Sequence, residues 1–542
     1  MRLLHFTLSR YVPNLRAVNT FRILALLVLV AGPVILSWQG WRQQERVPAS
    51  GADLVTSAQA AWDFLHHGSI PSVGAVSSTL GRIPPGSAWL LLPGVALSND
   101  RRLYELPSTA LLHLLSVTGI IVLGKLLISE ACGWLAASLY AYSWTAMFFS
   151  ALLWPRGHPA FVVWVVICCV VALRKSQPSA LALAALIFAA GMYVAPEILP
   201  LGIVLPLTVA KNRRTFSWRW AVPAVASCLI IWAPYLHTQI REHFVDVRYL
   251  VGAPPVTTQQ AQPAWCESPQ VIYDQIGRPI DVPPADLHYP PRPHFTSVWH
   301  KIRYFIEMFL QSWTYNMAAH AHERIAARCL NVALFGLLIL GCFRMPRDHA
   351  GLLVLAVFLA GQVIWGLLGG AEDRRFYWLW PLQCIIIASA ILWLCNKIQI
   401  PWQPVAILLL ILSAWDGGTT ATRIRAWRSD SWSGRDDEIT EQIDRIVRNL
   451  PPGLQQTSIS YDAHVMPYVF WFNPVDRRYT VSMVYDQYLL HRYGVRNSVF
   501  CVDSYRSDAN YVVRESPTVG CCYIRRVSLA EPLRQSAAPG SH

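Results

Sequence analysis

Long apolar runs recur through roughly the first three quarters of this chain of 542 residues and then stop. Each run approaches the length of about 20 residues that an α-helix needs to cross the hydrocarbon core of a bilayer. The composition agrees, because 54% of the residues are hydrophobic and 14% are charged, with a mean hydropathy of +0.33. These values exclude an ordinary soluble enzyme. We therefore predict a polytopic membrane protein whose fold class is mainly α.

Basic residues at the ends of the runs predict how the helices are oriented. Arg2, Arg10 and Arg16 precede the first run, so the positive-inside rule places the N-terminus in the cytoplasm. The first run has no small-residue cleavage site after it, and we expect a retained helix rather than a signal peptide. In all we predict about eleven transmembrane helices, an odd number that leaves residues 416–542 on the outer side. The predicted spans are residues 21–38, 107–128, 131–152, 159–173, 179–196, 198–210, 219–236, 326–343, 350–369, 376–396 and 400–415.

The sequence divides into a membrane domain at residues 1–415 and a C-terminal part at residues 416–542. In the second part, DDEITEQIDRIVRNL has the spacing of an amphipathic helix, while TSISY, RYTVSMV and DANYVV are typical of short strands. We predict a small soluble α/β domain there. Four cysteines lie in predicted outer segments, where an oxidising compartment would allow a disulfide whose pairing the sequence does not determine. They are Cys266, Cys501, Cys521 and Cys522.

The formal net charge of +13 is interpreted by where the basic residues lie. Much of it stands at membrane borders, where basic side chains set topology and meet anionic lipid head groups. We therefore expect membrane lipids among the partners and no nucleic acid.

Residues 51–94 form a first outer loop that is too polar to span a bilayer. Within it, Leu54–His66 carries apolar residues at helical spacing, as a short helix lying on the membrane surface would. A re-entrant segment at Trp89–Leu97 would follow it. A second long outer loop, residues 237–300, leads into an amphipathic segment at residues 298–317. The landmarks of the first loop are Asp53 at the start of its helix, Gly68 at the end, and Arg82 ahead of Pro84 and Pro85.

Three arginines run against the positive-inside rule because they lie in short outer loops. They are Arg156 in WPRGHP and Arg374 and Arg375 in AEDRRFYWLWP. Arginine stays charged and binds phosphate oxygens in a bidentate fork, which suits the anionic phosphate of a polyprenyl lipid. The alternative explanation is ordinary lipid head groups, or ion pairs with Glu372 and Asp373.

The first outer loop resembles that of the GT-C membrane glycosyltransferases, particularly relatives of the protein O-mannosyltransferases and lipid A aminoarabinose transferases. Those enzymes have an acidic residue after the first transmembrane helix, then an interfacial helix ending near a glycine, then a basic-Pro-Pro element. Asp53, Gly68 and Arg82 occupy those places here. Many relatives follow the first acid directly with a second one, whereas this chain has Leu54 there. That departure argues against a metal at the site.

A second local match lies at the start of a late transmembrane helix. Arg375 and Tyr377 resemble the Arg-Tyr element that GT-C relatives place near the donor phosphate, although Phe376 separates them here. The resemblance implies that the donor phosphate and lipid are bound by basic and aromatic residues of the outer face. The residues in these positions are Arg82, Arg156, Arg374, Arg375 and Tyr377.

The resemblance implies a glycosyltransferase that moves a hexosyl or pentosyl unit from a polyprenyl-phosphate donor to an acceptor, with inversion. Asp53 would be the general base that takes the acceptor's proton, and the alternative is that Asp53 is only the N-cap of its helix. The acceptor would be a surface glycan, a glycolipid or a protein. The expected location is a bacterial inner membrane, with the active site and the C-terminal domain facing the periplasm or exterior.

Two other classes of function compete with this interpretation. A transporter or flippase for lipid-linked glycans would share the length and the basic outer loops. Transporters tend to show internal repeats and charged or broken helices near the midplane, whereas acidic residues are nearly absent from these apolar runs. A non-catalytic glycan-binding membrane subunit is the third interpretation.

The histidines give little support for a metal cofactor. His66 and His67 are adjacent on the predicted helix and diverge, so we expect them to face solvent rather than share a ligand. His320, His322 and Glu323 in HAHE have a spacing that would allow metal contact, which we do not expect. We predict no certain cofactor and do not favour a divalent metal.

Overall fold

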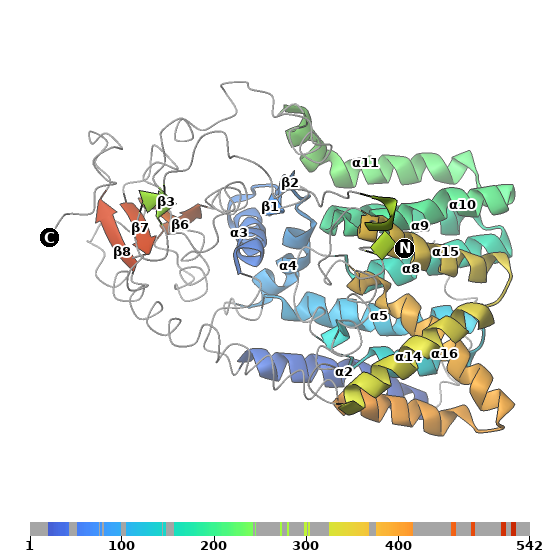
Figure 1. Cartoon of the computed structure of the whole chain (residues 1–542). Helices are drawn as coiled ribbons and strands as arrows, with labels where there is room; N and C mark the ends of the chain where they lie inside the picture. Colours follow the sequence, from blue (N-terminus) through green and yellow to red (C-terminus); the bar gives the residue numbers. More distant parts are fainter. Residues whose placement is uncertain are drawn as a thin grey trace.

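Helices make up most of the computed structural model, as the sequence predicts (Figure 1). The structure describes residues 20–42, 51–74, 76–77, 81–98, 104–143, 145–147, 157–241, 244, 297–300, 302–303, 325–367 and 376–415. It also describes short strands at 272–273, 279–280, 457–461, 479–482, 511–515 and 522–526. Most helix bounds agree with the apolar runs to within a few residues.

The helices follow one another in the order of the predicted spans. The first group is α2 (Thr20–Arg42), α5 (Leu106–Leu127), α6 (Glu130–Tyr140), α8 (Pro159–Lys175), α9 (Pro178–Val194), the 3-10 helix η3 (Pro196–Ile203), α10 (Val204–Lys211), η4 (Arg213–Thr215) and α11 (Trp218–Arg241). The second group is α14 (Ile325–Arg344), α15 (His349–Leu367), η8 (Tyr377–Leu379), α16 (Trp380–Lys397) and a helix at Trp402–Trp415.

The predicted span at residues 131–152 is interrupted after α6. Ser143 donates a hydrogen bond from Oγ to the Tyr140 carbonyl at 2.7 Å and accepts one from the Ala146 amide at 3.3 Å. A serine that bonds the backbone in this way favours a turn and a new helix start over a continuous helix. Residues 148–156 of this predicted span and its following loop lie outside the described residues.

The predicted span at residues 198–210 also differs from one regular helix. Its first part is η3 and its second part is α10. Pro200 lies inside η3, and proline has no N–H to donate to the preceding turn. A tighter 3-10 segment at the outer end of this span is the result.

Three described helices are long and apolar enough to cross a membrane, at Leu106–Leu127, Trp218–Arg241 and Tyr377–Lys397. Shorter apolar helices accompany them at Arg22–Leu36, Gly86–Leu97, Pro178–Val194, Val332–Arg344, His349–Ile364 and Trp402–Trp415. The helical membrane architecture is therefore supported, and the count of about eleven spans stays a prediction.

Helix α16 lies inside the bundle and packs against α5, α6, α8 and α14. Its side chains from Trp380 to Ala390 are buried, which explains why the run is apolar on every face. Trp380 donates a hydrogen bond from Nε1 to Ser143 Oγ at 2.8 Å. At Gly341, an added Cβ would overlap the carbonyl oxygen of Ile386, so the backbones of α14 and α16 are in contact.

The first helix, α2, is tied to the bundle where Pro33 interrupts its hydrogen bonding. Proline leaves the carbonyl four residues earlier, that of Leu29, without its helical donor. His113 donates from Nε2 to this carbonyl at 3.2 Å. Tyr142 donates from Oη to the neighbouring Val28 carbonyl at 2.6 Å. Two buried polar side chains therefore satisfy the backbone around the proline.

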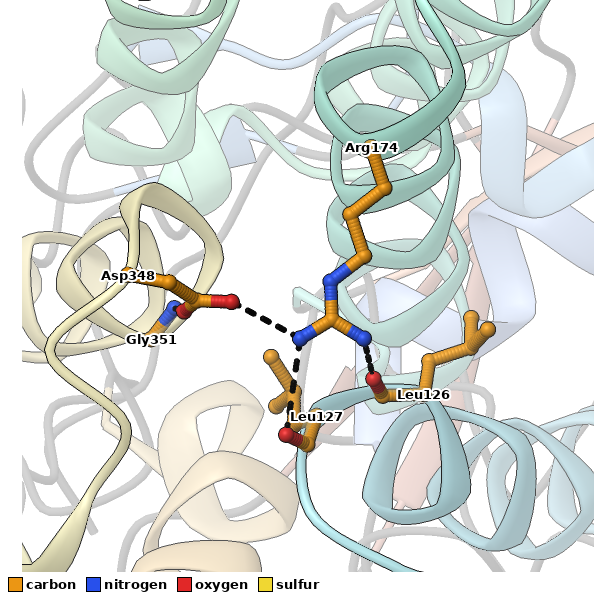
Figure 2. A network of polar contacts seen from close by, with 5 residues as sticks. All are labelled: Leu126, Leu127, Arg174, Asp348 and Gly351. Atoms are coloured by element: carbon orange, nitrogen blue, oxygen red, sulfur yellow. Dashed lines mark hydrogen bonds and ion pairs between the residues drawn. The ribbon is translucent and has the colours of Figure 1, made fainter.

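At the predicted inner end of the bundle, Arg174 of α8 links the end of α5 to Asp348, the residue before α15 (Figure 2). Its guanidinium lies 2.9 Å from Asp348 Oδ2 and donates to the carbonyls of Leu126 and Leu127 at the end of α5. Burial alone would raise the pKa of Asp348, but hydrogen bonds from Gly351 and Arg174 outweigh it and lower that pKa. This end is the one that the basic residues predict to face the cytoplasm.

The C-terminal strands form one four-stranded sheet in the order β6-β5-β7-β8. Strand β5 is parallel to β6 and to β7, and β7 is antiparallel to β8. The three predicted strands correspond to β5, β6 and β7, and β8 was not predicted. The predicted helix at residues 436–450 lies outside the described residues. The bounds are Thr457–Tyr461 for β5, Tyr479–Ser482 for β6, Tyr511–Glu515 for β7 and Cys522–Arg526 for β8.

Candidate functional site

The first outer loop begins with helix α3 (Gly51–His67), close to the predicted Leu54–His66. Asp53 is the third residue of α3, and its side chain lies outside the described atoms. Both interpretations of Asp53, as general base and as N-cap, therefore stay predictions. Gly68 ends the helix with φ of +69°, a left-handed conformation that favours glycine.

Helix α3 is anchored on α4 (Gly86–Leu97), which occupies the segment expected to be re-entrant. Ser57 Oγ and Ser87 Oγ are 2.7 Å apart, and the rings of Phe64 and Trp89 meet edge to face at 4.8 Å. Both helices lie at one end of the bundle, together with the hairpin of β1 (Val76–Ser77) and β2 (Gly81–Arg82) (Figure 1). Arg82 is thus on β2, paired with Val76.

The loop reaches the membrane helices at the end of α9. A Cβ added to Gly86 would overlap the backbone of Tyr193, so the start of α4 touches the last turn of α9. The chain then passes through Ala195 into η3, whose second residue is Glu197. The first outer loop therefore packs closely against the chain segment that leads into Glu197.

Glu197 is an acidic side chain that is only 3% exposed. Its Oε2 accepts a hydrogen bond from the Gly157 amide at 3.2 Å. Gly157 is the residue that follows Arg156 and precedes His158, which stands at the N-terminus of α8. A buried ionisable group at a membrane helix end is a candidate for function.

His158 pairs with Tyr377 across the outer end of the bundle. His158 Nδ1 and Tyr377 Oη are 3.1 Å apart, and the two residues are 2% and 1% exposed. Arg156 and Arg375 lie outside the described residues, but each is two positions before one of this pair.

The N-termini of α8 and η3 lie close together, because Gly157 contacts Glu197. The start of η8, which continues into α16, lies beside them, because Tyr377 contacts His158. The N-terminal end of a helix carries partial positive charge and exposed N–H groups, which favour an anion. Trp378 adds a buried donor, because its Nε1 has no hydrogen-bond acceptor within the described part of the chain. Chemically, the arrangement suits a phosphate more than a cation.

Sequence reasoning singled out the arginines and Tyr377 but missed His158 and Glu197. The available signal was an acid inside the apolar segment VAPEILPL and a histidine close to Arg156. Arg156, Arg374 and Arg375 lie outside the described residues, so their roles stay predictions. Asp53 and Arg82 stay in the first outer loop, which joins the cluster through α4 and α9.

No metal-binding group of three His, Cys, Asp or Glu side chains occurs among the residues that the structure describes. His66 is exposed, stacks on Trp62 with ring centroids 3.8 Å apart, and bonds the Trp62 carbonyl at 3.0 Å. The His66 ring therefore makes its contacts within α3. His320, His322 and Glu323 lie outside the described residues.

No protein-family model matches the chain, and no curated protein matches it. Several solved structures match the chain. The matching structures include ArnT and an archaeal oligosaccharyltransferase. ArnT from Cupriavidus metallidurans, bound to undecaprenyl phosphate, has a TM-score of 0.48 and 12% identity, over 86% of this chain and 88% of that one.

Two archaeal structures are also similar. The Archaeoglobus fulgidus oligosaccharyltransferase with zinc and sulfate has a TM-score of 0.45 and 12% identity, over 83% of this chain and 62% of that one. AglB of the same organism, with an inhibitory peptide and a dolichol phosphate, has a TM-score of 0.39 and 11% identity, over 95% and 76%.

Proposed function

We propose that this protein is a membrane glycosyltransferase that uses a polyprenyl-phosphate-linked sugar donor at the outer face of the membrane. One observation supports the proposal: His158 and Tyr377 are buried and 3.1 Å apart, and each follows a predicted phosphate-binding arginine by two positions in the sequence. Arginines in short outer loops are otherwise disfavoured. An anionic ligand shared by both predicted loops would account for their arginines.

The chemistry needs few groups. Negative charge develops on the phosphate as it leaves, and fixed cations near it lower the barrier. Arg156, Arg374 and Arg375 supply these cations from the bundle, and Arg82 supplies one from the first outer loop. Tyr377 contributes to the same donor region.

Asp53 is the proposed general base. It takes the proton of the attacking acceptor hydroxyl or amine, while attack from the face opposite the phosphate inverts the anomeric carbon. A positioned base of this kind contributes about 10² to 10⁴-fold to the rate. No metal is required in this scheme, and the transferred unit is a hexosyl or pentosyl group.

The acceptor is a surface glycan, a glycolipid or a protein on the same side as Asp53. We place that side at the periplasm or exterior of a bacterial inner membrane, with residues 416–542 also outside. The odd number of predicted spans and the basic inner ends support this orientation.

The test is transfer of labelled sugar by the purified protein in lipid nanodiscs, using a panel of polyprenyl-phosphate monosaccharides and membrane extracts as acceptors. Asp53→Asn should lower turnover by at least about 10²-fold with little change in melting temperature. Asp63→Asn is the matched control on the same helix and should keep its activity. Equal activity of Asp53→Asn and wild type would remove the base assignment.

A transporter would behave differently in the same preparation. It would move a lipid-linked glycan between the leaflets of a proteoliposome without forming a new glycosidic bond. Flipping without transfer by the wild-type protein would overturn the enzymatic proposal.

A further inference from the structure

We propose that Arg344, Trp393 and Lys397 form a binding site for the phosphate head group of an anionic phospholipid. The three residues lie where α14 and α16 end, at the membrane border that the basic residues predict to be the inner one. We call them the paired-cation site. The inference does not depend on the proposed glycosyl transfer, because none of these residues belongs to the predicted donor site.

Two cations lie over the ring of Trp393, which is half-buried on α16. Arg344 Cζ is 3.9 Å from the centroid of this ring, and Lys397 Nζ is 5.2 Å from it. Because both distances are measured from one point, the two cations can be no further apart than their sum. Lys397 comes from the same helix one turn later, whereas Arg344 comes from α14. The ring therefore brings together cations from two helices.

The packing of α14 on α16 fixes this arrangement (Figure 1). A Cβ added to Gly341 would overlap the carbonyl oxygen of Ile386, so the two backbones touch about one turn before Arg344. Arg344 is the last residue of α14, and Lys397 is the last residue of α16. Both cations are therefore carried by regular helix, and a site built on helices is held more firmly than one built on loops.

The two cations have donors available for a ligand. Arginine stacks on aromatic rings by its flat face, and its N–H groups then point outward in the plane of the guanidinium. Within the described part of the chain, neither Arg344 nor Lys397 has a hydrogen bond or an ion pair. Asp348, the acid closest to Arg344 in the sequence, lies 2.9 Å from Arg174 instead. The charge of the pair is therefore not balanced by an acid among these residues.

An anion between two such cations would remove their mutual repulsion. A phosphate group has oxygens on opposite sides, so it can accept charge-assisted hydrogen bonds of about 2.7–2.9 Å from both cations at once. Basic pockets between transmembrane helices bind the head groups of anionic lipids in this way. The charge of the site and its place at a helix end therefore match an anionic phospholipid.

Apolar neighbours favour a lipid over a free phosphate ion. Phe343, next to Arg344, is 67% exposed, and Ile398, next to Lys397, is 60% exposed. At a membrane border, exposed apolar side chains contact acyl chains, from which a free phosphate ion would gain nothing. Tryptophan is itself enriched at this depth, because its ring is apolar and its N–H is polar.

The helix dipole gives a simpler reason for basic residues at these positions, because a helix C-terminus favours a cation. That reason does not account for the whole arrangement. The last carbonyls of α16 already accept hydrogen bonds, Leu394 from the Ile398 amide and Cys395 from the Ile400 amide, each at 2.9 Å. The dipole of α14 also gives no cause for Arg344 to lie over a ring of the neighbouring helix.

Titration of palmitoyl-oleoyl phosphatidylglycerol into the delipidated full-length protein in neutral detergent tests the site, with bound lipid counted by native mass spectrometry. Arg344→Gln and Lys397→Gln should each weaken binding of the first lipid about fivefold, which corresponds to about 1 kcal/mol per basic residue. Trp393→Leu should also weaken it although both charges remain, and Trp393→Phe should weaken it less.

The double variant of Lys125→Gln with Arg213→Gln is the matched control for charge. Both residues are exposed cations near Arg174, at the same end of the bundle, and neither lies over an aromatic ring in the part of the chain that the structure describes. This variant should bind the lipid like wild type, whereas Arg344→Gln with Lys397→Gln should lose about 10-fold to 30-fold. Equal losses in the two double variants would mean that the positive charge acts diffusely, and would overturn the site.

Two further comparisons decide the nature of the ligand. Phosphatidylcholine has the same phosphate but no net charge, so it should bind more weakly than phosphatidylglycerol to wild type and equally to all the variants. Equal binding of the two lipids by wild type would contradict the proposal, and so would displacement of the lipid by an excess of inorganic phosphate. The melting temperature without added lipid should be unchanged in the glutamine variants, because all four positions are exposed.

Discussion

We expect the arginines of the predicted outer loops to supply the positive charge that the donor phosphate meets. Arg374→Ala or Arg375→Ala should raise the KM for the donor and lower turnover, because each removes a cation from the leaving phosphate. Lysine at either position should restore only part of the activity, since it lacks the bidentate fork. Steady-state kinetics with a labelled donor measures both effects.

Arg347→Ala is the matched control for these variants. Arg347 is exposed between α14 and α15, beside Asp348 at the opposite end of the bundle, and its loss should not change the donor KM. If both Arg374→Ala and Arg375→Ala bind the donor like wild type, the phosphate site lies elsewhere, with Arg82 and Arg156 as the next residues to change.

At the level of single residues, the sequence singled out arginines that break the positive-inside rule in the predicted topology. They lie outside the described residues, so their roles stay predictions. His158 and Glu197 break the pattern less clearly, and their importance comes from neighbours such as Tyr377 and Gly157 that are distant in sequence. Pairing of this kind depends on tertiary packing, which hydropathy does not encode.

Two glycines of α14 offer a paired test at the scale of the element. Gly341→Ala should lower the stability of the protein by about 1–3 kcal/mol, because the new methyl group would overlap the Ile386 carbonyl and push α14 from α16. At Gly336, a new methyl group would meet nothing within 4 Å. Gly336→Ala should therefore be neutral or stabilise the helix by up to about 1 kcal/mol.

Thermal unfolding in detergent compares the two glycine variants directly. A larger loss at Gly336 than at Gly341 would contradict the close contact of α14 and α16. The comparison is internal, since both substitutions add one methyl group to the same helix.

The apolar runs of the sequence predicted where the helices lie, but they did not predict where the helices are interrupted. Hydropathy averages over many residues, so it located α5, α8 and α16 closely. Ser143 ends a helix through two hydrogen bonds to nearby backbone, and Pro200 lies in a segment that becomes 3-10 helix. Both effects are local and are lost in an average.

At the scale of the whole molecule, the topology predicts where the C-terminal part lies. About eleven spans that begin inside must end outside, so residues 416–542 should share a compartment with Asp53. The parallel pairing of β5 with β6 and β7 is typical of an α/β unit, and the separate domain at residues 416–542 stays a prediction. A reporter fused after His542 that is active only in the cytoplasm would overturn this orientation.

If the C-terminal part is outside, we expect it to act on the acceptor rather than on the lipid donor. The donor is expected at Arg82, Arg156, Arg374, Arg375 and Tyr377, all of which belong to residues 1–415. Truncation before Trp427 should therefore leave undecaprenyl phosphate binding within about twofold of wild type, a difference of well under about 1 kcal/mol, while transfer to the native acceptor falls strongly. Loss of donor binding in the truncated protein, with an intact helical spectrum, would mean that residues 427–542 belong to the donor site.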